Sequence, residues 1–227
     1  DLQLVQTVTD VDGDTDEAAL NLGESGKEVF SIDDDGPDAK MDADFEGDPA
    51  SIALDETDLT GSSLSATEDF SVHFVTGSTV DYGTDCEGSV EYSLDLSDEG
   101  IKSGLYALDA TDTVDDEQVD PDGIGQGDEI LLYTNGDIVE GRTGVTDQST
   151  GTLHFTISVD NSTGKEGEVT FTQLLNIWHS VAGDDDLGEH DDTETLTTVN
   201  SGDLQLVQTV TDVDGDTDEA ALNLGES

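Results

Sequence analysis

The sequence predicts an all-β protein, an immunoglobulin-like antiparallel β-sandwich in the broad sense. Apolar and polar residues alternate with a period of two in several segments. One apolar and one polar face is the pattern that an antiparallel sheet in a sandwich requires. Helical signals are scarce, because residues 173–180 are the only stretch that offers a short helix or helical turn.

Alternation defines the expected strands along the chain. It is clearest in residues 70–74, 90–96 and 153–157. Further strands are expected, in chain order, at 2–9, 18–22, 28–32, 51–54, 129–133, 137–140, 168–173, 194–199 and 204–211. We expect the strands at 18–22 and 28–32 to form a hairpin. His73 and His154 fall on the polar phase of their strands, so both side chains are expected to face solvent.

The first 25 residues, Asp1–Ser25, return letter for letter as Asp203–Ser227. Such identity indicates recent duplication in a tandem array of whole domains. The domain boundary is predicted at Asp33–Pro37, where a strand is followed by a Gly-Pro pair that cannot continue a ladder. We therefore expect residues 1–36 to be the C-terminal strands and linker of an upstream repeat. Residues 37–227 are then one repeat that lacks its last strand.

This organisation suggests what the partners are. Neighbouring repeats of the same chain are the expected contacts. Strand 28–32 of one molecule is a candidate to fill the vacant position in another, by strand exchange between molecules.

The charge is extreme, with 57 acidic residues against 5 basic ones and a formal net charge of −52. Such a charge argues against nucleic acid and anionic membranes as partners, and no apolar run is long enough for membrane insertion. Two explanations stay open: a solvated halophile-type surface, or binding sites for hard divalent cations. The single cysteine, Cys86, allows no disulfide within the chain.

The segment Thr9–Glu17 presents four aspartates around a glycine. It is not an EF-hand, because Gly13 and Asn21 stand where that loop needs other residues. Its density of carboxylates nevertheless exceeds what a turn needs, and Ca²⁺ accepts irregular sets of oxygen ligands. The predicted ligands, with their counterparts in the second copy, are Asp10, Asp12, Asp14, Asp16, Asp212, Asp214, Asp216 and Asp218.

Two other acidic segments are candidate ligands. Asp33, Asp34 and Asp35 follow the expected strand 28–32, and the expected hairpin places them at the same pole as the loop 10–17. A bound Ca²⁺ there would bridge carboxylates that otherwise repel one another. A second loop site is predicted from Asp120, Asp122 and Asp128.

Catalytic constellations are missing from the sequence. There is no nucleophile elbow, phosphate-binding loop, zinc spacing or dinucleotide motif. The sequence therefore predicts that the protein is not an enzyme.

The segments VTDVDGDTDEAALNL and FSIDDDGP resemble the end-and-linker signature of repeat domains in giant RTX adhesins exported by type I secretion. Further matches occur at residues 53–59, 80–108, 128–142 and 167–180, in the family's order. The resemblance implies a calcium-bound extender domain of a bacterial cell-surface adhesin, with a role in adhesion and biofilm formation. It also implies that the aspartates of 33–35, 10–16 and 212–218 are the interdomain calcium ligands.

Two functions from different classes follow as expectations. The first is a calcium-stiffened spacer that projects a distal ligand-binding tip from the cell. The alternative is an adhesive module that itself recognises a glycan, a peptide or a surface. Near-perfect repetition favours the spacer, since a binding tip is normally present once.

Overall fold

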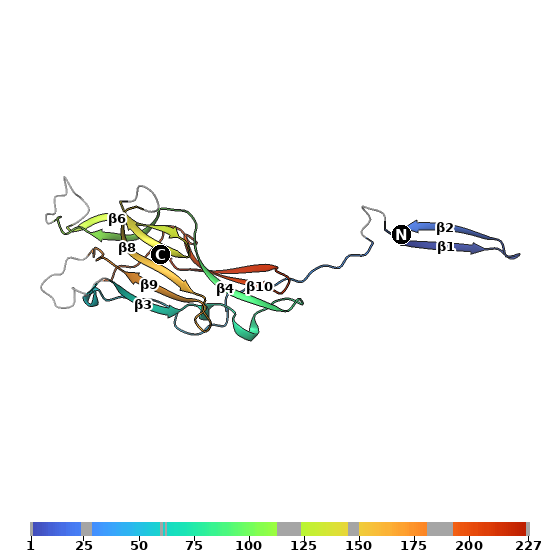
Figure 1. The fold of residues 1–227 in the computed structure, drawn as a ribbon, viewed down its shortest axis with the longest axis horizontal. Helices are drawn as coiled ribbons and strands as arrows, with labels where there is room; N and C mark the ends of the chain where they lie inside the picture. Colours follow the sequence, from blue (N-terminus) through green and yellow to red (C-terminus); the bar gives the residue numbers. More distant parts are fainter. Residues whose placement is uncertain are drawn as a thin grey trace. The chain divides into compact units, whose positions relative to one another are not determined.

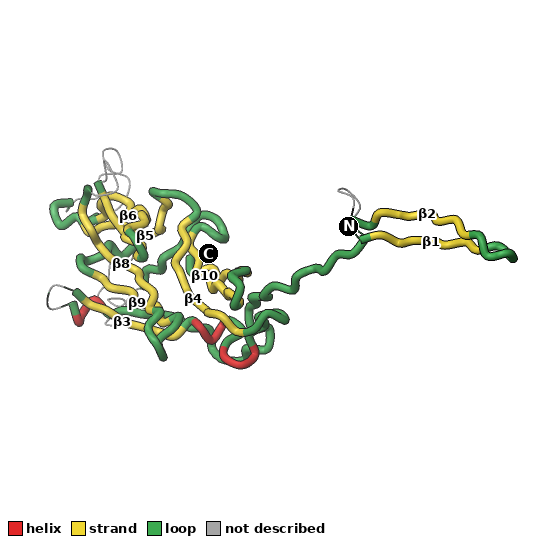
Figure 2. The backbone as a smooth tube through the Cα atoms, turned by 45° about the vertical axis from the view of Figure 1, so that its right-hand side comes forward, coloured by secondary structure: helices red, strands yellow, loops and turns green. Residues whose placement is uncertain are grey.

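A computed structural model describes residues 2–23, 29–59, 61, 63–112, 124–144, 150–180 and 193–225. The chain divides into two units, residues 1–35 and 36–227. In the described residues, helix is limited to the 3-10 turns η1 (Glu56–Asp58), η2 (Ser71–His73) and η3 (Gly77–Thr79). Every sheet pairing is antiparallel, so the predicted all-β class is confirmed (Figures 1 and 2).

The described residues of the first unit contain one hairpin. Strand β1 (Gln3–Thr9) pairs with β2 (Thr15–Asn21), from Gln3 opposite Asn21 to Thr9 opposite Thr15. The expected hairpin of 18–22 with 28–32 is therefore wrong, because residues 18–21 already pair with β1 and residues 29–32 form no strand. The short Asp/Gly turn joins β1 directly to β2, so residues 18–21 pair with β1 more readily than with residues 28–32.

The second unit is a sandwich of two sheets. A three-stranded sheet has the order β11-β10-β4, and a six-stranded sheet has the order β3-β9-β8-β7-β6-β5. The strands are β3 (Leu64–Asp69), β4 (Glu87–Leu96), β5 (Ile101–Leu108), β6 (Gln126–Asn135), β7 (Ile138–Thr143), β8 (Thr152–Asp160), β9 (Glu168–Gln173), β10 (Leu204–Asp212) and β11 (Thr217–Asn223).

The core lies between the two sheets. One cluster of buried apolar side chains contains Tyr92 of β4, Leu206 of β10, and Phe155 and Ile157 of β8. Phe74, which follows η2, packs edge-to-face on Tyr92 with ring centroids 5.5 Å apart. The alternating burial of β10, buried at every second residue, is the pattern expected for a strand with one face on this core.

Strand β4 holds the closing hairpin β10–β11 in place. It pairs with β10 from Leu204 opposite Leu96 to Asp212 opposite Glu87, and the two strands run side by side in Figure 1. At Gly88 a Cβ would lie 2.2 Å from the carbonyl oxygen of Thr211. Glycine is therefore required where β4 approaches the end of β10.

Several expected elements differ in the structure. Residues 70–74 form the turn η2 and its two flanking residues instead of a strand. This turn buries the side chains of Phe70 and Phe74. Residues 51–54 and 194–199 pass along the sandwich without forming strands, and residues 173–180 form no helix. Strands β3 and β5 were not expected.

The histidine prediction is also wrong. His154 is buried in β8, where its Nε2 lies 2.9 Å from Oγ1 of Thr143. His73 belongs to η2, and its Nε2 accepts a hydrogen bond from the Ala50 amide. Burial lowers the pKa of His154 below its ordinary value, because charging the ring there would cost desolvation.

Candidate metal centre

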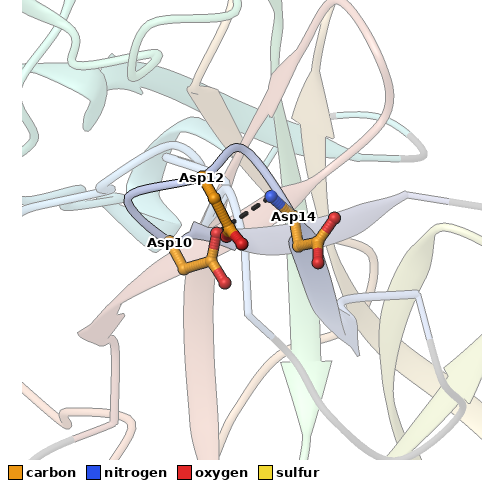
Figure 3. Close-up of side chains that lie close together, drawn as sticks. All are labelled: Asp10, Asp12 and Asp14. Carbon is orange, nitrogen blue, oxygen red and sulfur yellow. Dashed lines mark hydrogen bonds between the residues drawn. The ribbon is translucent and has the colours of Figure 1, made fainter.

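The acidic loop is the turn of the β1–β2 hairpin. The Asp10 carboxylate accepts hydrogen bonds from the amides of Gly13, at 3.1 Å, and Asp14, at 2.9 Å. Gly13 has a φ of +98°, a conformation that favours glycine. The turn folds back on itself, so oxygens of Asp10, Asp12 and Asp14 lie within 4.8 Å of one another (Figure 3).

The second copy of the loop has the same geometry. The Asp212 carboxylate accepts from the amides of Gly215, at 3.0 Å, and Asp216, at 2.9 Å. Oxygens of Asp212, Asp214 and Asp216 again lie within 4.8 Å of one another. Because one copy sits in an isolated hairpin and the other in a sandwich, the local sequence alone determines this turn.

Burial distinguishes the two copies. Asp10 is exposed, whereas Asp212 is only 3% exposed. The second carboxylate oxygen of Asp212, Oδ2, is buried and has no hydrogen-bond partner. A buried carboxylate oxygen without a partner is costly, and a cation is one of the few groups that relieve that cost.

The Asp212 carboxyl remains ionised despite its burial. Burial raises its pKa, but a side-chain hydrogen bond with Asp214 and hydrogen bonds from the amides of Gly215 and Asp216 outweigh it, and the pKa is lowered. In the exposed copy, a side-chain hydrogen bond with Asp12 is the largest cause that lowers the pKa of Asp10. Both loops therefore present negative charge at neutral pH.

Asp85 adds a carboxylate that sequence analysis did not single out as a ligand. It lies in the loop before β4, and one of its oxygens is within 4.8 Å of an Asp214 oxygen. The next residue, Cys86, is exposed and has a φ of +81°, unusual for a residue other than glycine. The neighbourhood of Asp85 is created by the pairing of β4 with β10, so no local motif indicates it.

The start of the second unit runs beside the same loop. The Ala39 amide donates to Oδ2 of Asp218 at 2.9 Å, and Gly36 lies against the side chain of Asp216. Asp38 forms an ion pair with Lys40, and this contact is the main cause that raises the pKa of Lys40. The loop 212–218 therefore marks the end of the sandwich at which the unit begins.

The other predicted ligands are placed as follows. Asp33, Asp34 and Asp35 are exposed in a segment without strand or helix. Asp16 accepts a hydrogen bond from the Glu17 amide, and Asp128 is an exposed residue of β6. Asp120 and Asp122 lie outside the described residues.

The donor set fits a hard divalent cation. All of the clustered atoms are carboxylate oxygens, which suit Ca²⁺ or Mg²⁺ and not a metal that prefers nitrogen or sulfur. Ca²⁺ fits the irregular spacing better, since Mg²⁺ demands a near-ideal octahedron.

Comparison with known proteins gives one match. Neither the curated proteins nor the solved structures contain a match to this chain. In the part of the chain that the structure describes, no helix is long and apolar enough to span a membrane. The profile of one family, described as a domain of unknown function (DUF5801), matches residues 51–225, well over half of the chain. The chain therefore belongs to the DUF5801 family.

Proposed function

We propose that this protein is a calcium-stiffened spacer, an extender domain of a bacterial cell-surface RTX adhesin. In this role it acts in cell adhesion and biofilm formation by holding a ligand-binding tip away from the cell. The observation that carries the calcium part of the proposal is the buried Asp212 carboxylate, whose Oδ2 has no hydrogen-bond partner, in a cluster of carboxylates. The repeated 25-residue segment and the resemblance to RTX adhesin repeats support the spacer role and the extracellular location.

Asp212, Asp214 and Asp216 would hold the ion, and Asp85 is close enough to contribute. Bound Ca²⁺ supplies positive charge to a chain with a net charge of −52. Without it, the carboxylates of loop 212–216 repel one another beside the start of the unit at Gly36–Ala39. With it, the loop and the strands that carry it are locked together, which favours a stiff array.

The two copies of the loop provide a matched experiment. Calcium titration followed by thermal unfolding is measured for the wild type, for Asp212→Asn and for Asp10→Asn. An ion that binds only the folded state adds about 2.7 kcal/mol at a hundred times its dissociation constant. For a unit of this size that corresponds to a rise in Tm of roughly 5–11 °C.

We expect Asp212→Asn to lose most of this rise, because it removes the buried charge that the ion neutralises. In chelator the same variant should be at least as stable as the wild type. Asp10→Asn should leave the main transition unchanged with or without calcium. If chelation does not move the wild-type Tm, the calcium proposal fails and the halophile-type surface is favoured.

Stiffness is tested separately by small-angle scattering from a protein of several tandem repeats. The maximum dimension should fall on chelation, as a rod becomes a flexible chain. An array that is equally flexible with saturating calcium would contradict the spacer role even if calcium binds.

A further inference from the structure

The β1–β2 hairpin exposes an apolar face that its sequence twin buries. Leu4 and Val8 are 62% and 59% exposed, whereas the equivalent Leu206 and Val210 are both 0% exposed. The hairpin pairings are the same in both copies, with Leu4 opposite Leu20 and Leu206 opposite Leu222. The difference therefore lies in what covers the face and not in the hairpin.

In the second unit this face is buried in the core shared with the six-stranded sheet, and β10 is held in that position by its pairing with β4. In β10, Leu206 pairs with Leu94 of β4, Gln208 with Tyr92 and Val210 with Val90. The Gln208 amide nitrogen donates to the Tyr92 hydroxyl at 2.8 Å. Every β10 side chain in this contact has an identical counterpart in β1.

Strand β1 also offers the same backbone edge. The first sheet contains only β1 and β2, so the edge of β1 that corresponds to the β4-facing edge of β10 pairs with no other described strand. An open strand edge beside an apolar face is a template for pairing with another chain.

We propose that the hairpin of residues 2–23 is a strand-exchange surface, and that its partner is β4 of a second copy of this chain. In the exchanged complex, β1 of one molecule takes the place of β10 of the other, in the same register. Because β1 has the same side chains as β10, it makes the same interactions with β4, and the exchange occurs whenever the resident hairpin β10–β11 is released. Identical neighbouring domains are subject to this kind of misassembly.

The first test uses full-length chains that are refolded together. The acceptor carries Leu4→Asp, Val8→Asp, Leu206→Asp and Val210→Asp, so neither of its own hairpins can bury its apolar face in the position beside β4. We expect it to form a heterodimer with the wild-type chain, detected by size-exclusion chromatography with light scattering. A donor with Leu4→Asp and Val8→Asp should form none. A heterodimer that survives these two donor changes would overturn the proposal.

The second test avoids the four core substitutions of the acceptor, so it works even if that variant does not fold. Ser93 of β4 pairs with Val207 in the resident hairpin, and exchange would place Val5 there instead. A chain with Val5→Cys, Ser93→Cys and Cys86→Ser is partly unfolded, refolded and oxidised. Covalent dimers joined through these two cysteines, lost when Leu4→Asp and Val8→Asp are added, are expected. No cross-link, or one confined to single molecules, would overturn the proposal.

Discussion

The effect of one substitution made in each copy of the hairpin can be derived from burial alone. Leu206 is 0% exposed in the core, whereas Leu4, in the same sequence context, is 62% exposed. Truncation of a buried leucine to alanine removes apolar contacts and leaves a cavity, at a cost of about 2–5 kcal/mol. Leu206→Ala should therefore lower the free energy of unfolding by about 3 kcal/mol. Leu4→Ala should change it by less than about 0.5 kcal/mol, as for exposed positions generally.

The assay is urea and thermal unfolding at low protein concentration with saturating calcium. For a unit of this size, about 3 kcal/mol corresponds to a fall in Tm of roughly 6–12 °C. The double variant tests independence, and its loss should equal that of Leu206→Ala. Equal losses for Leu4→Ala and Leu206→Ala would refute the reasoning, because the two hairpins would then be packed alike. A loss below about 1 kcal/mol for Leu206→Ala would show that β10 is not part of the core.

Three further predictions concern the sandwich. Burial lowers the pKa of His154, so the stability that the neutral ring contributes is complete above the unfolded value of about 6.5. That stability is lost as the pH falls from there through the lower folded pKa. His154→Gln should therefore flatten the slope of unfolding free energy against pH between about pH 7 and 5 in chelator. Arg142 forms a 2.6 Å ion pair with buried Glu140 and lowers the pKa of that carboxyl. Arg142→Met should therefore lower the free energy of unfolding by about 3 kcal/mol in chemical denaturation. Adding Glu140→Gln should restore part of that loss. Gly88→Ala should destabilise the unit and weaken calcium binding in calorimetry, because its Cβ would strike β10 backbone, whereas Gly61→Ala, with nothing within 4 Å, should do neither.

Sequence periodicity identified the strands whose faces alternate cleanly. The prediction for β9 was residues 168–173, as observed, and β10 and β8 differ only at their ends. Strand β5 gave no such signal because Gly104 interrupts it. That glycine has a φ of +72° and lies against the Thr197 carbonyl, a contact made by a distant segment.

The sequence predicts only the part of the site that is formed by residues of one turn. The clusters of Asp10, Asp12 and Asp14 and of Asp212, Asp214 and Asp216 follow from the turn sequence. The burial of Asp212 cannot follow from that sequence, because Asp10 has identical neighbours and is exposed. It depends on β4, as does the approach of Asp85.

The contact between Ala39 and Asp218 also has a mechanical consequence. The unit begins beside the loop end of the closing hairpin, while Gly225 lies at the hairpin's other end, where its carbonyl accepts from the Thr198 amide. Tension applied to Gly36 and Gly225 is therefore directed along β10 and β11. Ladder hydrogen bonds are perpendicular to antiparallel strands, so such a force loads many of them together in shear. The domain should resist pulling better than one whose strands are peeled apart one bond at a time.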